Sequence, residues 1–171
     1  MKPIRSLLVC TTDLQGGAAR SSYRLLEGFD RLNLVETRMW VQNKTGDHPS
    51  VFEDRSFLGR LRANYSKRID YLFISKIYRK CRSLFSSNIV PAFLPHEATN
   101  FAPHIFHFHW IADGFINPEF LTHFPGKVVW TLHDMWPLTG GCHFDEGCKK
   151  YLTSCGACPV LQSRIDRKSV V

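Results

Sequence analysis

The apolar residues of this chain fall into short runs that alternate with stretches of helical period. Residues 6–10 (SLLVC) hold a continuous apolar run, which is typical of a strand buried inside a parallel sheet. From Ala19 onward apolar side chains recur with helical spacing, so a helix is expected to begin just after Gly16-Gly17. Residues 36–44 (ETRMWVQNK) alternate between apolar and polar, and this pattern predicts a second strand.

The second half of the chain continues this alternation. Residues 104–110 (HIFHFHW) and 127–134 (KVVWTLHD) predict two more strands. Between them, residues 117–124 predict a short helix with Asn117 as its N-cap, whereas the proline-rich residues 88–103 are expected to form a loop. Strands that alternate with helices predict an α/β fold, a single Rossmann-like domain over residues 1–171 with a parallel sheet and helices on both faces.

Residues 58–84 predict an amphipathic helix, or two shorter ones, because their apolar side chains recur at helical steps. This part of the chain also carries most of the net charge of +7, since residues 55–84 hold nine lysines and arginines and a single acid, Asp70. The basic residues are Arg55, Arg60, Arg62, Lys67, Arg68, Lys76, Arg79, Lys80 and Arg82. A local basic stripe with interleaved tyrosines is either a solvated helix face or a contact with an anionic membrane surface.

Two glycines, Gly16 and Gly17, stand between the first predicted strand and the helix that follows it. Glycine allows a ligand to approach the backbone closely, and the free amides at the start of a helix attract anions. The pair therefore predicts either a contact with a diphosphate or simply a tight turn. It does not form the G-x-G-x-x-G pattern of a dinucleotide site.

Two histidine clusters stand at the ends of the later strands, in FHFHWIADGF and WTLHDMWP. In parallel sheets ligands bind at the carboxyl ends of strands, so His109, His133 and Asp134 are candidates for hydrogen bonding to a sugar or for proton transfer. Trp110 and Trp136 offer flat faces on which a sugar ring can stack. Histidines can also be purely structural, but two such clusters at one sheet edge favour a binding site.

Four of the six cysteines lie in a Cys-rich segment, residues 142–158, at Cys142, Cys148, Cys155 and Cys158. Four thiolates suffice for a tetrahedral structural zinc site, and the C-x-x-C at its end is a usual half of one. The first half is wider than usual, and His143 could replace one sulfur. Unliganded buried thiols and disulfides are the alternatives, while Cys10 and Cys81 are expected to be packing residues.

The N-terminal segment has an apolar run too short for a signal peptide and no small-residue cleavage site. No apolar run reaches the length of about 18 residues that a transmembrane helix needs. We therefore expect a cytoplasmic protein, in which reduced thiols favour metal over disulfides.

Three stretches resemble the N-terminal half of bacterial glycosyltransferases of family 4, above all those that build exopolysaccharide, capsule or O-antigen. They are DLQGGAARSSYRLLEGF, HFHWIADGFINPEFL and VVWTLHDMWPLTGGCHFDEGCKKYLTSCGACPVL. The resemblance implies a GT-B architecture, in which two Rossmann-like domains face each other across a cleft. The N-terminal domain binds the acceptor and the C-terminal domain the nucleotide sugar, and transfer retains the anomeric configuration without a metal ion.

The resemblance also implies roles for individual residues. Gly16 and Gly17 would face the donor diphosphate, His133 followed by Asp134 would line the reaction centre, and the acceptor side would include His109, Trp110 and Trp136. The second domain of the family, which binds the donor, does not appear in these 171 residues. The chain is therefore expected to be truncated and inactive alone.

The expected partners are a nucleotide-sugar donor, bound through the missing domain, and a glycan or lipid-linked acceptor. An anionic membrane surface is expected to contact residues 55–84, with the protein peripheral on the inner face of the plasma membrane. No cofactor is expected for the chemistry, and nucleic acid is not expected as a partner. The alternative is a zinc-stabilised basic module that binds nucleic acid, and a secreted disulfide-rich protein would need a signal peptide.

Overall fold

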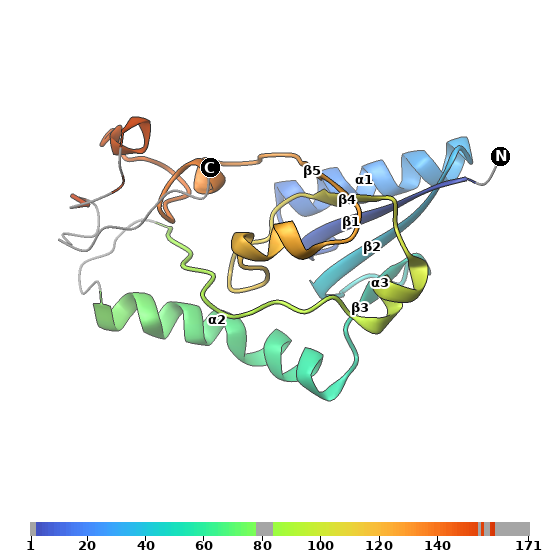
Figure 1. Ribbon diagram of the computed structural model, residues 1–171, viewed down its shortest axis with the longest axis horizontal. Helices are drawn as coiled ribbons and strands as arrows, with labels where there is room; N and C mark the ends of the chain where they lie inside the picture. Colours follow the sequence, from blue (N-terminus) through green and yellow to red (C-terminus); the bar gives the residue numbers. More distant parts are fainter. Residues whose placement is uncertain (1–2, 78–83, 154, 156–157, 160–171) are drawn as a thin grey trace.

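Five parallel strands form the sheet in this computed structural model, in the order β3-β2-β1-β4-β5 (Figure 1). The strands are β1 (Ile4–Thr12), β2 (Val35–Asn43), β3 (Val51–Glu53), β4 (Ile105–Phe108) and β5 (Lys127–Trp130). The structure describes residues 3–77, 84–153, 155 and 158–159. The predicted α/β fold with a Rossmann-like parallel sheet is confirmed, although β4 and β5 are shorter than expected and β3 was not predicted.

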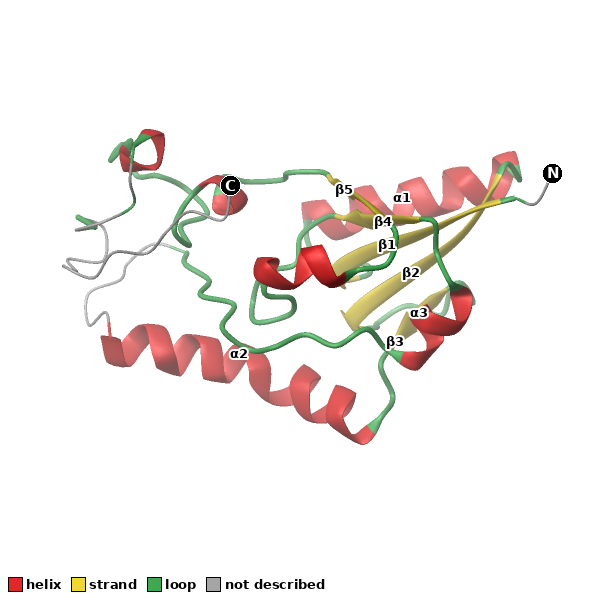
Figure 2. Ribbon diagram, in the orientation of Figure 1, coloured by secondary structure: helices red, strands yellow, loops and turns green. Residues whose placement is uncertain are grey.

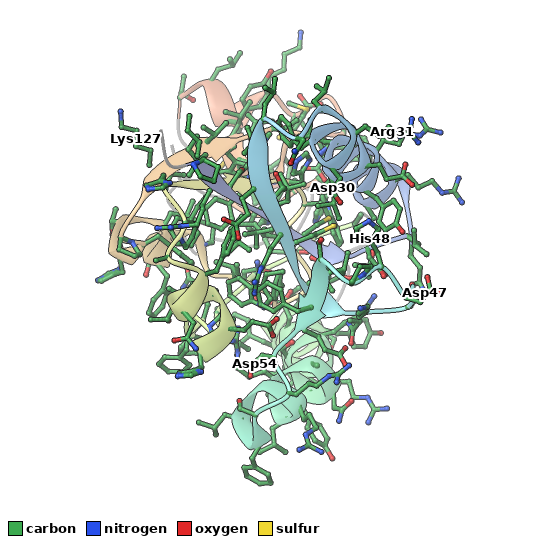
Figure 3. The ribbon with its side chains drawn as sticks, turned by 90° about the vertical axis from the view of Figure 1, so that its right-hand side faces the viewer. Asp30, Arg31, Asp47, His48, Asp54 and Lys127 are labelled. Atoms are coloured by element: carbon green, nitrogen blue, oxygen red, sulfur yellow. The ribbon has the colours of Figure 1, made fainter. Side chains whose placement is uncertain are left out.

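Helix α1 (Gly17–Leu32) covers one face of the sheet, as the figure with coloured secondary structure shows (Figure 2). Its buried residues Ala19 and Leu26 pack on a cluster that includes Cys10, which confirms the predicted packing role of this cysteine. The helix starts at the predicted position. On its outer surface the Oδ2 atom of Asp30 lies 3.5 Å from the Nε2 atom of His48, and this contact joins the helix to the loop before β3 (Figure 3).

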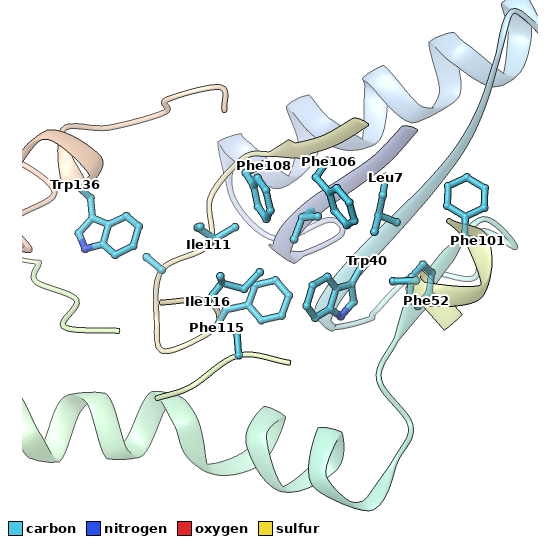
Figure 4. Packing of buried hydrophobic residues seen from close by; sticks show 14 residues of the cluster. Leu7, Trp40, Phe52, Phe101, Phe106, Phe108, Ile111, Phe115, Ile116 and Trp136 are labelled. Carbon is cyan, nitrogen blue, oxygen red and sulfur yellow. The ribbon is translucent and has the colours of Figure 1, made fainter. Parts of the chain in front are cut away.

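The opposite face of the sheet carries the larger apolar core (Figure 4). Phe106 and Phe108 of β4 are fully buried there, beneath the loop 111–116. Helix α3 (His96–Phe101) closes the same core with Ala98 and Phe101. The prediction of a loop at 88–103 is therefore wrong for these six helical residues, because burial in the core stabilises a helix too short to persist alone.

The predicted short helix after β4 is a 3-10 helix, η1 (Pro118–His123). The side chain of Asn117 accepts a hydrogen bond from the amide of Glu119, so the predicted N-cap is confirmed. Two further 3-10 turns follow, η2 (Trp136–Leu138) and η3 (Lys150–Leu152). Within the described ranges, none of the helices combines the length and the apolar character needed to cross a membrane.

Helix α2 (Phe57–Ile77) is one continuous helix that lies along the outside of the domain (Figure 1). Apart from Ile74 near its end, the inward side of this helix is polar. Ser66 and Asp70 are buried, and Ser66 accepts a hydrogen bond of 2.5 Å from the side-chain amide of Gln42. Asp70 accepts hydrogen bonds from the amide and hydroxyl of Ser87. Polar contacts rather than apolar packing therefore hold most of this helix to the sheet domain.

A glycine in the loop after β4 allows α2 to approach closely. Gly114 has a φ of +75°, and a Cβ atom there would lie 2.7 Å from the carbonyl oxygen of Ser66. Gly147 has the same φ, but a Cβ atom at that position would meet nothing within 4 Å. Substitutions at the two glycines therefore distinguish the energetic cost of backbone strain from that of steric contact.

We expect Gly147→Ala to lower the free energy of unfolding by about 1 kcal/mol, through the left-handed backbone alone. Gly114→Ala should lower it by about 2 kcal/mol more, because the methyl group also displaces α2. Urea unfolding of the two variants measures the difference. Equal losses would mean that α2 does not lie against Gly114.

Candidate functional site at the carboxyl edge of the sheet

The carboxyl ends of β1, β4 and β5 lie side by side, and we call the residues that follow them (13–17, 109–110 and 131–134) the carboxyl edge. The strand order reverses between β1 and β4, which is where open α/β sheets bind ligands. Strands in a sheet lie about 4.8 Å apart, so the ends of β1 and β5 are separated by roughly 10 Å. The structure thus brings together, at one edge, the strand ends that precede the predicted glycine and histidine residues.

The Gly16-Gly17 turn leaves the backbone open at the start of α1. Gly16 has a φ of +94° and is the N-cap residue, with no side-chain hydrogen bond to the helix amides. Both glycines are exposed, and a Cβ atom on either would meet nothing within 4 Å. The first-turn amides of this 16-residue helix are therefore free to face an anion.

Asp13, which precedes this turn, ties the end of β1 to the loop after β2, and it was not among the residues expected to form the site. Its buried carboxylate accepts hydrogen bonds from the Thr45 hydroxyl and the Gly46 amide, both at 2.7 Å. Burial favours the protonated acid, but these hydrogen bonds outweigh it and lower the pKa of Asp13 below its usual value. An acid directly after an apolar strand was the only signal in the sequence, because its partners lie some thirty residues away.

Two histidines from neighbouring strand ends contact each other directly. The Nδ1 atom of His109 lies 2.9 Å from the Nε2 atom of His133, with the rings stacked 5.2 Å apart. The ring of His107 lies 4.5 Å from that of His109 and is tilted by 32° against it, and its Nε2 atom lies 2.8 Å from the hydroxyl of Thr131. His109 is 4% exposed, whereas the ring of His133 reaches solvent.

These imidazoles are neutral at pH 7. Burial, together with the charges of His107 and His133, lowers the pKa of His109 to about 3. Burial also lowers the pKa of His133, although the nearby carboxylate of Asp134 opposes that shift. The pair therefore acts through hydrogen bonds and not through a fixed positive charge.

The buried surroundings of His109 also assign the tautomers of the pair. The Nε2 atom of His109 is buried and has no hydrogen-bond partner among the described residues. A buried N–H without an acceptor costs more than a bare acceptor nitrogen, so we place the proton of His109 on Nδ1, where it donates to His133. His133 then carries its own proton on Nδ1, where it can donate to a ligand.

Asp134 is the centre of a second hydrogen-bond network. Its carboxylate accepts hydrogen bonds from His143 Nδ1 at 2.5 Å, from the indole of Trp110 at 2.8 Å and from the amide of Trp136 at 2.9 Å. Burial by itself would raise the pKa of Asp134, but these donors, His143 first, lower it below its usual value. The carboxylate is thus ionised and already bonded, which favours a positioning role over proton transfer.

The chain Ser86–His143–Asp134 has the connectivity of a hydrolase triad, since His143 Nε2 lies 2.9 Å from the Ser86 hydroxyl. Both Ser86 and His143 are completely or almost completely buried, at 1% and 0% exposure. A substrate therefore cannot reach the serine hydroxyl. The chain fixes the loops behind the carboxyl edge instead.

The two candidate tryptophans differ in burial and in their contacts. Trp110 is half-buried at the carboxyl edge and is oriented by its hydrogen bond to Asp134. Trp136 is buried in the core, where its indole N–H donates to the carbonyl of Ser86 and its ring packs edge-on against Trp130. This placement argues against the predicted stacking of a sugar on Trp136.

The structure describes all four cysteines of the Cys-rich segment. Cys142 is buried beside Ile74 and Phe85, and Cys158 packs against the same cluster, whereas Cys148 and Cys155 lie partly exposed. Among the residues that the structure describes, no three His, Cys, Asp or Glu side chains are grouped as a metal ion requires. A zinc site at Cys142, Cys148, Cys155 and Cys158 therefore stays a prediction. Cys81 lies outside the described residues.

The fold is a Rossmann-like α/β domain, and its candidate ligand site lies at the topological switch point. Over 78 residues the chain is 37% identical to a protein of Escherichia coli (strain K12) named "Putative colanic acid biosynthesis glycosyl transferase WcaC". The match covers 38% of this chain and 19% of the relative, so the chain spans only a small part of that protein. No family model matches the chain, and no solved structure matches it either. Over the matched part, the chain is related to a glycosyltransferase.

The low pKa of His109 makes the stability of the domain depend on pH. Below the ordinary pKa of 6.5 the unfolded chain takes up a proton at this residue, whereas the folded chain resists protonation down to about 3. The free energy of unfolding should therefore decrease as the pH falls below 6.5, by at most about 1.4 kcal/mol per pH unit for this residue. His109→Gln should flatten that slope, and His123→Gln, an exposed control, should not.

Urea unfolding at several values between neutral pH and about pH 4 measures the slopes. A slope unchanged by His109→Gln would show that His109 is not buried in its neutral form.

Proposed function

We propose that the carboxyl edge is the acceptor side of a glycosyltransferase site. In this proposal a sugar moves, with retention of the anomeric configuration, from a nucleotide-sugar donor to a glycan or lipid-linked acceptor. The product belongs to a cell-surface polysaccharide. The observation that carries the proposal is the 37% identity to a glycosyltransferase named for colanic acid biosynthesis. The gathering of Gly16-Gly17 and His133 at one sheet edge supports it.

The geometry supports different binding roles for the two sides of the edge. The amides at the Gly16-Gly17 turn provide partial positive charge for the diphosphate that leaves in the transfer. His133, neutral and held by His109, donates its Nδ1–H to a sugar hydroxyl. Asp134 orients Trp110, whose half-buried ring forms the apolar wall of the acceptor site.

We propose that a second, donor-binding domain completes the site, as in a GT-B enzyme. Helix amides carry only a fraction of a unit charge, which is not enough to stabilise a departing diphosphate without further cations. The chain spans about a fifth of the relative's length in the match, so a partner domain of ordinary size is consistent with that relative. The 171-residue chain alone is accordingly expected to be inactive.

The test is a chimera in which this chain is joined to the part of the Escherichia coli relative that follows the matched segment. Radiolabelled nucleotide sugars and a lipid extract that contains lipid-linked glycans supply donor and acceptor, and donor hydrolysis gives a readout that needs no acceptor. We expect transfer by the chimera and none by the chain alone. His133→Ala should lower kcat by about a hundredfold, whereas Leu132→Ala, its exposed neighbour, should have little effect.

Transfer by the 171-residue chain without a second domain would refute the half-site proposal. Full activity of the His133→Ala chimera would refute the assigned role of His133 but not the function.

The open space above Gly17 gives a separate prediction for the same chimera. A leucine side chain at position 17 would meet no protein atom near its Cβ and should change the free energy of unfolding by no more than about 0.5 kcal/mol. It would, however, occupy the space that the donor diphosphate needs, so Gly17→Leu should raise the KM for the donor at least about tenfold. Gly28→Leu is the matched control on the same helix, also without neighbours within 4 Å. Equal KM values for the two variants would place the donor elsewhere.

A further inference from the structure

Helix α2 presents an apolar stripe to solvent. Large apolar side chains recur along it at steps of three or four residues, which places them on one face: Leu58, Leu61, Tyr65, Ile69 and Leu72. Their exposed fractions lie between 39% and 63%, so the stripe is uncovered over nearly the full length of the helix. The sequence predicted an amphipathic helix, and the structure turns its apolar face away from the core.

The stripe cannot turn inward without breaking the polar contacts on the opposite side of α2. Besides the bonds of Ser66 and Asp70, the guanidinium of Arg62 donates to the carbonyl of Phe115 at 2.6 Å. The ammonium group of Lys67 lies 2.7 Å from the carboxylate of Asp113. These contacts fix the rotation of the helix, so the exposed stripe is a property of the folded domain.

Positive charge flanks the stripe. Arg60, Arg68 and Lys76 are exposed, and Arg68 and Lys76 form no ion pair with any described residue. The only acid of residues 55–84, Asp70, is buried and bonded to Ser87, so it does not offset this charge at the surface. Arg55 and Lys67 do have acidic neighbours, in Glu53 and Asp113.

We infer that this face of α2 docks on an anionic lipid bilayer, with the apolar stripe in the interface and the exposed cations on the lipid headgroups. Aliphatic side chains flanked by cations, with exposed tyrosines such as Tyr65 and Tyr71, are the composition of an interfacial helix. The inference depends on α2 alone and not on the proposed transfer reaction.

Two other occupants fit the surface less well. A second copy of the chain would bring two strongly basic faces together, and like charges oppose such a contact. A nucleic acid would use the cations, but its phosphate backbone offers nothing to the leucine and isoleucine side chains of the stripe. A bilayer satisfies both the charge and the apolar side chains.

The experiment is co-sedimentation of the chain with vesicles of phosphatidylcholine alone or of equal parts phosphatidylcholine and phosphatidylserine. We expect binding to the anionic vesicles that weakens with added salt. Leu61→Ser with Leu72→Ser should lower the partition coefficient by about tenfold or more, because both side chains leave the interface. The matched control is Leu32→Ser with Leu34→Ser, two exposed leucines at the end of α1, and it should bind like the unchanged chain.

A second pair of variants tests the charge. Arg68→Gln with Lys76→Gln should lower binding by roughly ten- to thirtyfold, since each cation near an anionic surface contributes about fivefold. Arg24→Gln with Arg31→Gln removes the same charge from α1 and should have a small effect. Circular dichroism and thermal unfolding verify that all variants fold like the unchanged chain.

Several results would overturn the inference. These are absence of binding to anionic vesicles, equal binding to the two kinds of vesicle, or equal losses in the α2 variants and their α1 controls. Sedimentation velocity that shows a dimer lost in the Leu61 and Leu72 variant would assign the stripe to a second copy. Salt-sensitive binding to a DNA or RNA duplex, without vesicle binding, would assign it to nucleic acid.

Discussion

The ionised carboxylate of Asp134 joins the loops behind the carboxyl edge, and the geometry of the candidate site depends on it. Its donors come from the end of β4 (Trp110), from the turn after β5 (Trp136) and from the Cys-rich segment (His143). His143 and Trp136 in turn both bond Ser86, which brings the segment after α2 to the same place. Hydrogen bonds to a charged group contribute about 1.5–3 kcal/mol each to stability, so this network fixes the positions of four segments that are distant in the sequence.

The histidine pair is likewise positioned by a buried side chain. Because His109 is buried beside two other imidazoles, it stays neutral, and the hydrogen bond of its ring orients His133. On the far side of β4, Asp13 ties the end of β1, just before the glycine turn, to the loop after β2. Buried carboxylates and a buried imidazole therefore shape the edge, while the groups that they orient are the ones a ligand can reach.

Helix α2 is attached to the domain differently from the other elements. Elsewhere the elements bury apolar faces against the sheet, whereas α2 is attached through Ser66, Asp70 and Arg62. That polar attachment leaves the apolar and basic side chains outside. The carboxyl edge and the exposed face of α2 are thus separate features, one lined by hydrogen-bonding groups and the other by apolar and basic side chains.

Local patterns in the sequence determined which segments form the main strands, where α1 begins and that Asn117 caps η1, because these depend on near neighbours along the chain. They also placed Gly16-Gly17 and His133 after strands. Helix α3 could not be predicted, since six residues become helical only when Ala98 and Phe101 are buried by distant segments. Only the tertiary structure decided that Trp136 enters the core, that His109 meets His133 and that the apolar stripe of α2 faces outward. Periodicity tells which side chains share a face, but burial is set by contacts between segments far apart in the chain.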